Sequence, residues 1–227
     1  MRFQLPDMHR IDGRRADWEK IPPEEWNPSQ VRAAQTHGID TPGNRETFQG
    51  ALYSLGGLAC IHHGHTLVGT ILLGIGGYKD IKDGKVADAT GTKSPIGEGA
   101  DAAADAALIV VGVPVFIESG LITKDEGVAM LGLVATKTIG YGVGKLRGQA
   151  PPQPSRFGKI GMFGQRAGVG LRLASRVAEQ NNLEDLAGRI KRASDVTLHA
   201  GIALSAIANL GYLTKSVGQN PIMGAEA

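Results

Sequence analysis

The chain has 227 residues with a formal net charge of +2 and one cysteine, and 33 of its residues are glycine, roughly twice the usual share. The glycines follow no collagen period and lie outside any proline- or serine-rich low-complexity run, which excludes fibrous and disordered classes. One cysteine excludes a disulfide framework and a thiolate zinc site, and the small net charge gives no argument for a nucleic-acid partner.

Residues 1–43 are polar and carry both tryptophans, several prolines and many charges. We expect this segment to form a cytoplasmic N-terminal arm with an amphipathic stretch that lies at a membrane surface. A partly disordered polar tail is the alternative for the same residues.

Beyond the arm, three runs contain no Asp, Glu, Lys or Arg, at 48–78, 106–117 and 196–214. A bilayer-spanning helix needs about 20 mostly apolar residues, so the first run with its flanks suits two short spans. We predict an all-α integral membrane bundle over residues 44–215, followed by a tail at 216–227. Its six transmembrane helices are expected near 46–62, 65–82, 100–120, 126–144, 159–177 and 196–214.

The spacing of the glycines favours this bundle over a soluble domain, although the mean hydropathy of -0.08 alone is that of an ordinary soluble protein. Gly140, Gly144 and Gly148 are spaced by four, as are Gly164 and Gly168. Small residues at this spacing let membrane helices approach closely, whereas glycine inside a soluble helix costs about 1 kcal/mol relative to alanine. A soluble, metal-binding protein with a glycine- and alanine-rich core is the alternative.

The distribution of basic residues predicts the orientation. Six spans place both termini on one side of the membrane, and basic residues concentrate in the arm and in the connections 83–99 and 146–158. The positive-inside bias therefore places these segments in the cytoplasm, although the basic cluster within 189–192 falls on the opposite side. We expect a multi-pass protein of the cell membrane (plasma or inner).

Four aspartates carry the strongest chemical signal. Asp80 and Asp83 are three residues apart, and Asp101 and Asp105 are four apart, so each pair shares a helix face. One pair ends a span and the other opens the next, so both are expected at the same membrane edge, the cytoplasmic one. Converging carboxylates favour hard divalent cations, Mg²⁺ or Mn²⁺, and two such ions could clamp a pyrophosphate. Scattered loop acids are the alternative.

Small residues surround these aspartates. Gly84, Ala87 and Gly97 lack bulky side chains and would let a nucleotide pack against the backbone. Read together, the spacing is Asp-x2-Asp-Gly-x2-Ala-x9-Gly-x3-Asp-x3-Asp, which resembles the signature of the CDP-alcohol phosphatidyltransferase family of integral membrane enzymes. Seven of the eight fixed positions of that signature match, and Asp88 stands where the family has arginine.

A second segment refines the resemblance. Residues 158–165 are similar to the Gly-Lys-x-Lys-Thr-x-x-Gln segment of phosphatidylglycerophosphate-synthase-like members. Gly158, Lys159 and Gln165 match, whereas Gly161 and Met162 replace the second lysine and the threonine.

The resemblance implies a reaction and roles for individual residues. The enzyme would transfer a phosphatidyl group from CDP-diacylglycerol to a small hydroxylated acceptor and release CMP, with glycerol 3-phosphate as the first choice of acceptor. Inositol phosphate or another polar alcohol is the alternative acceptor, and a non-catalytic membrane protein that keeps the fold is the alternative function. A homodimer is also implied.

The candidate site residues fall into three sets, of which the resemblance assigns the first two. Two Mg²⁺ or Mn²⁺ ions would be held by Asp80, Asp83, Asp101 and Asp105, with Asp105 as the catalytic base. The cytidine nucleotide would lie against Asp80, Gly84, Ala87 and Gly97. If the acceptor carries a phosphate, the nearby cations Lys159, Arg166 and Lys137 would supply the charge that binds it.

Overall fold

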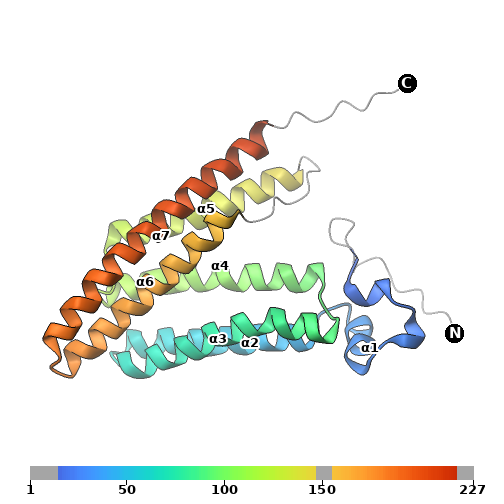
Figure 1. Ribbon diagram of the computed structural model, residues 1–227, viewed down its shortest axis with the longest axis horizontal. Coiled ribbons are helices and arrows are strands. Elements are labelled where there is room, and N and C mark those ends of the chain that lie inside the picture. The colour runs from blue at the N-terminus through green and yellow to red at the C-terminus, as the bar shows by residue number, and fades with distance from the viewer. Residues whose placement is uncertain (1–14, 147–154, 219–227) are drawn as a thin grey trace. The chain divides into compact units, whose positions relative to one another are not determined.

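The computed structural model describes residues 15–146 and 155–218, and this part of the chain contains seven α-helices, two short 3-10 helices and no strand. The chain divides into two compact units, residues 1–108 and 109–227, with the boundary inside helix α4. Three predicted segments lie partly outside the described residues: the arm, the connection 146–158, which contains Gly148, and the C-terminal tail. Figure 1 shows the helices of each unit.

The first unit contains the 3-10 helices Asp17–Lys20 and Pro23–Glu25, then α1 (Pro28–Gln35), α2 (Pro42–His62), α3 (Thr66–Thr90) and the first half of α4 (Pro95–Glu118). The second unit contains the rest of α4 together with α5 (Lys124–Leu146), α6 (Arg156–Gln180) and α7 (Glu184–Gly218).

The N-terminal arm is folded around a buried tryptophan. Trp18 is 1% exposed and packs with Ala16, Ala33 and Ala34, and Trp26 covers this cluster. The Trp26 indole donates to the carbonyls of Trp18 (2.8 Å) and Ile21 (3.0 Å). From residue 15 onward, therefore, the arm is an ordered element, held by apolar burial and by satisfied indole hydrogen bonds.

Glycines set the close packing of α2 on α3. Gly50 and Gly57 of α2 lie seven residues apart, as do Gly69 and Gly76 of α3. A Cβ at Gly57 would lie 2.9 Å from the Gly69 carbonyl oxygen, and one at Gly50 would lie 3.1 Å from the Gly76 carbonyl oxygen. Each glycine thus meets the opposite backbone directly, as the small-residue packing of membrane helices requires.

The second unit uses the same device between α6 and α7. A Cβ at Gly164 would lie 2.9 Å from the Gly201 Cα, and one at Gly168 would lie 2.7 Å from the Leu198 Cα. The predicted spacing of Gly164 and Gly168 is therefore a helix-contact stripe. Buried hydroxyl bonds reinforce it, since Ser194 Oγ donates to the Gly168 carbonyl over 2.7 Å.

Each predicted span lies within one of the helices α2 to α7, apart from at most two residues at an end, which confirms the all-α class. Among the helices of the described residues, α4 alone is both long and apolar enough to cross a membrane, so the structure does not establish six spans. The other helices carry charged and small polar residues that lower their hydropathy.

Two predicted connections are wrong in length. The connection expected at 83–99 shortens to 91–94, because α3 continues to the left-handed Gly91 (φ 62°) and α4 begins at Pro95. The connection expected at 178–195 shortens to 181–183. Glycine at the position after a helix and proline at the first helical position are the residues that fit such ends.

Candidate metal centre

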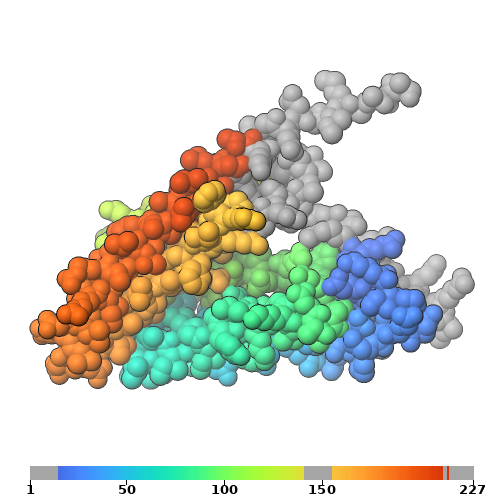
Figure 2. All heavy atoms as spheres, in the orientation of Figure 1, coloured from blue at the N-terminus to red at the C-terminus, as the bar shows by residue number. Residues whose placement is uncertain are grey.

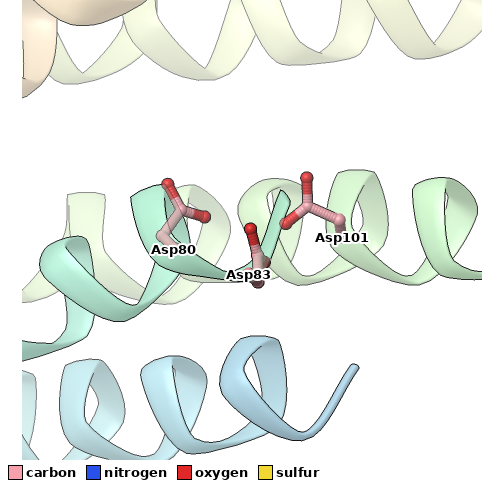
Figure 3. A group of neighbouring side chains, drawn as sticks. All are labelled: Asp80, Asp83 and Asp101. Carbon is pink, nitrogen blue, oxygen red and sulfur yellow. The ribbon is translucent and has the colours of Figure 1, made fainter. Parts of the chain in front are cut away.

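Three of the four signature aspartates meet in the first unit. Asp80 and Asp83 project from α3 and Asp101 projects from α4, and one carboxylate oxygen of each lies within 4.8 Å of those of the other two. Figure 3 shows these three side chains close together, two of them on α3 and one on α4. The spacing of the sequence thus places three carboxylates around one point, although they come from two helices.

Asp83 is the most buried of the three, at 9% exposure. Its Oδ2 accepts a hydrogen bond of 2.5 Å from the Thr47 hydroxyl of α2, and its Oδ1 accepts one from the Gly84 backbone N–H. Burial raises the pKa of the Asp83 carboxyl above its ordinary value, and the nearby Asp80 and Glu46 charges raise it further, although these two hydrogen bonds lower it. A divalent cation would favour the charged form of this carboxylate.

The donor set fits a hard divalent cation. Three carboxylates, one of them buried, supply the oxygen ligands that Mg²⁺ and Mn²⁺ prefer. Mg²⁺ commonly keeps several waters and takes few protein carboxylates, leaving positions for substrate phosphates. Asp80, Asp83 and Asp101 are therefore the residues of the described chain that could hold such an ion.

Asp105 lies one helical turn beyond Asp101 on α4 and is outside this group of three. Its predicted roles, as a ligand and as the base, stay predictions.

The three small residues predicted to line the nucleotide have different surroundings. A Cβ at Gly84 would meet nothing within 4 Å, so that position is open. The Ala87 side chain faces Gly43 of α2, and a Cβ at Gly97 would lie 2.8 Å from Asn44 Oδ1. Helix packing thus accounts for the small size of Ala87 and Gly97, and their contact with a nucleotide stays a prediction.

Asp88, which replaces the signature arginine, is directed to solvent. Its side chain is 63% exposed and pairs with Lys93 over 3.2 Å. It adds no carboxylate to the group of three.

The predicted acceptor residues belong to the second unit. Lys159 and Arg166 are exposed on α6 and Lys137 is exposed on α5. Lys159 and Arg166 are seven residues apart and so share one face of α6.

The same helix explains one departure from the second motif. Gly161 lies against α7, where an added Cβ would lie 2.7 Å from the Ser205 backbone nitrogen and 3.0 Å from the Gly201 carbonyl oxygen. This packing leaves no room for a lysine at position 161. Gln165 is buried there and donates to Ser205 Oγ over 2.7 Å, so its match reflects helix packing in this chain.

Two polar features were missed by the sequence reasoning. The first is Thr47, which follows Gly43 by four residues and precedes Gly50 by three, so it lies on the α2 face that contacts α3. The second is an ion-pair cluster in the second unit, where Arg172 contacts both carboxylate oxygens of Glu126 at 2.6 Å and Asp195 at 2.8 Å. In the same cluster, His199 Nε2 of α7 lies 3.1 Å from Glu126 Oε1.

Fold and site together define an all-helical protein with a carboxylate cluster suited to divalent cations. The chain belongs to the CDP-alcohol phosphatidyltransferase family, whose sequence profile matches residues 47–207 and so includes all four signature aspartates. Members are membrane-integral transferases that move a phosphatidyl group from a CDP-alcohol donor to an alcohol acceptor in phospholipid biosynthesis and use divalent metals. The comparisons found no matching curated protein and no matching solved structure.

Proposed function

We propose that the protein transfers the phosphatidyl group of CDP-diacylglycerol to glycerol 3-phosphate and releases CMP, as a phosphatidylglycerophosphate-synthase-like member of its family. The observation that carries the proposal is the meeting of Asp80, Asp83 and Asp101 within the family match. The acceptor is inferred from the partial motif at 158–165.

The proposed roles follow the signature. Asp80, Asp83 and Asp101, with Asp105 at their border, would hold two Mg²⁺ or Mn²⁺ ions, which when bound neutralise charge on the pyrophosphate of the donor. Asp80, Gly84, Ala87 and Gly97 would line the cytidine nucleotide. Asp105 would take the proton of the acceptor hydroxyl. The hydroxyl oxygen forms the new bond to the diacylglycerol-bearing phosphorus, and the bond from that phosphorus to the CMP oxygen breaks, so CMP leaves with the bonding electrons.

The exposed side chains of α2 and α3 support a membrane location with more than one span. Large apolar residues are exposed along both helices, and an apolar surface of this extent favours contact with lipid. The residues concerned on these two helices are Phe48, Leu52, Tyr53, Leu55, Leu67, Val68, Ile71, Ile75, Tyr78 and Ile81. We therefore propose a multi-pass protein of the cell membrane over residues 44–215, with the aspartates on the cytoplasmic side and with a homodimeric assembly.

The acceptor phosphate would be bound by cations of the second unit. Lys159 and Arg166 share one exposed face of α6, and two cations that bind the same phosphate need to lie on the same face. Lys137 of α5 is the third candidate. A charge-assisted bond to phosphate is about twice as strong as a neutral one.

The test uses purified full-length protein in detergent with CDP-diacylglycerol, Mg²⁺ and a panel of acceptors, and measures CMP and the lipid product. We expect product with glycerol 3-phosphate. Lys159→Gln and Arg166→Gln should each raise the KM for that acceptor about tenfold, whereas Arg176→Gln, exposed on the same helix, should not. Product with inositol phosphate alone would overturn the choice of acceptor, and no product with any acceptor would overturn the transfer reaction.

A further inference from the structure

The N-terminal arm contacts the connection between the two helices that carry the aspartates. Asn27 Nδ2 donates to the Thr90 carbonyl (3.1 Å), Gln30 Nε2 donates to the Gly91 carbonyl (3.3 Å), and the Asp17 backbone N–H donates to the Lys93 carbonyl (3.0 Å). These three bonds join the arm to the backbone of residues 90, 91 and 93. In Figures 1 and 2 the arm lies beside the end of α3 and the start of α4.

Thr92 and Ser94 of the connection are buried beside this contact. Thr92 is 2% exposed and Ser94 is 6% exposed. A Cβ at Gly91 would lie 2.6 Å from Gln30 Nε2, and one at Gly38 would lie 3.2 Å from both the Trp18 ring and Ser94 Oγ. The arm and the 91–94 connection therefore fit each other closely, and side-chain bonds and apolar packing both hold them together.

Helix packing contributes little to the placement of α4 relative to α3 in the described residues. Extensive helix packing in the described residues joins α2 to α3, but it joins neither of these helices to α4. Asp80 and Asp83 are nonetheless required to meet Asp101 across these two helices. The geometry of the metal centre thus depends on the short connection and on what holds it.

Asn44 provides a second tie at the same place. Its Nδ2 donates to the carbonyls of Gly38 (2.9 Å) and Ile39 (3.0 Å) in the arm, and its Oδ1 lies against Gly97 in the first turn of α4. The end of the arm, the start of α2 and the start of α4 therefore meet through one amide side chain.

We propose that the N-terminal arm is a clamp on the 91–94 connection and that Asn27 and Gln30 are positioning residues, which hold Asp101 in register with Asp80 and Asp83. This inference rests on the proposed function of these aspartates as metal ligands. Asn27 and Gln30 touch neither the metal centre nor the substrate in this scheme and act through the backbone of the connection.

The test separates this role from helix capping. Asn27 and Gln30 form a capping box at the start of α1, in which each side-chain oxygen accepts the other residue's backbone N–H. Asn27→Asp and Gln30→Glu keep these oxygens, so the cap survives, but both changes remove the amide donors to Thr90 and Gly91. The matched control is Gln35→Glu, the same chemical change at an exposed position of α1.

The first measurement is Mn²⁺ binding to the full chain in detergent, followed by electron paramagnetic resonance of the free ion. We expect the Asn27→Asp/Gln30→Glu variant to bind Mn²⁺ about tenfold more weakly than the wild type, because it loses two hydrogen bonds that hold the connection. The control Gln35→Glu should bind Mn²⁺ as the wild type does. The same variant should need about tenfold more Mn²⁺ for half-maximal CMP release, with kcat at saturating Mn²⁺ changed less than threefold.

A second measurement tests the same proposal with the single variant Asn27→Asp, in case the double variant folds poorly. Spin labels are attached to cysteines that replace Lys85 and Ala102, which are exposed positions on α3 and α4. The native Cys60 is replaced by serine, so the two labels report the distance between the helices. Asn27→Asp alone should broaden that distance distribution. Unchanged Mn²⁺ affinity and an unchanged distance would overturn the clamp, whereas a wild type that binds no Mn²⁺ would overturn the metal centre itself.

Discussion

Replacing Arg172 by leucine should destabilise the second unit strongly. The guanidinium of Arg172 bonds both oxygens of Glu126, the Leu121 carbonyl at 2.9 Å and Asp195. The side chains of Arg172 and Glu126 are only 11% and 7% exposed. The cluster thus joins α5, α6 and α7 through one buried cation.

The loss of unfolding free energy can be worked out from the carboxylate of Glu126, which stays buried after Arg172 is replaced. Breaking a buried pair by removing one partner costs about 3–5 kcal/mol, because the other charge stays buried. Glu126 would keep Thr123, whose backbone N–H donates to it over 2.7 Å, and His199, so we expect the lower end, about 3 kcal/mol. For a chain of this size each kcal/mol lowers Tm by about 2–4 °C, which gives a fall of about 6–12 °C.

The assay is thermal loss of monodisperse protein in detergent, measured by size-exclusion chromatography. The control is Arg176→Leu on the same helix, whose pair with Glu179 is 3.7 Å apart and about half exposed, so its loss should cost at most about 1 kcal/mol. The double variant Arg172→Leu/Glu126→Met should be more stable than the two single losses predict by addition, because no charge is left buried. Equal Tm values for Arg172→Leu and Arg176→Leu, or simple additivity in the double variant, would refute this reasoning.

Three further predictions follow from the same structure. Gly168→Ala should cost about 1–3 kcal/mol of stability through overpacking against the Leu198 backbone. Gly170→Ala should be neutral or up to about 1 kcal/mol stabilising, because a Cβ there meets nothing within 4 Å. Thermal unfolding of the two variants checks this difference. The hydrogen bond from Arg45 lowers the pKa of Asp40. The contribution of the ionised Asp40 to the stability of the folded arm is therefore present at neutral pH and is lost as pH falls below the ordinary range of aspartate. Fluorescence of Trp18 and Trp26, the two tryptophans of the chain, should therefore report loosening of the arm in acid, with a smaller step in Asp40→Asn; an identical step in both would contradict this role of Asp40. Chelation of divalent cations should abolish CMP release and added Mg²⁺ or Mn²⁺ should restore it, whereas turnover that persists in excess chelator would argue against a metal centre.

Local signals in the sequence predicted much of the fold and part of the candidate site. Six helices lie where six spans were expected, because apolar runs and their boundaries are local properties of the chain. The two aspartate pairs could be placed on helix faces from spacing alone, and Asp80, Asp83 and Asp101 do meet.

The remaining features depend on contacts between distant residues. Thr47 bonds Asp83 across 36 positions and Arg172 bonds Glu126 across 46, and no local pattern identifies such partners. The sequence left a partly disordered polar tail open as an alternative for the arm, because its buried core consists of Trp18 and three alanines and so gives only a weak apolar pattern. Its docking onto the 91–94 connection depends on amide side chains that bond to backbone carbonyls, which leave no signature in composition or periodicity.

Metal-dependent release of CMP from CDP-diacylglycerol tests the central claim most directly. Purified wild-type protein in detergent should release CMP with Mg²⁺ and glycerol 3-phosphate present, and Asp105→Asn should release none while it still binds Mn²⁺ and CMP. Release by Asp105→Asn at the wild-type rate would contradict the role of Asp105 as the base. A folded wild type that binds the nucleotide but releases no CMP with any acceptor would contradict the account as a whole.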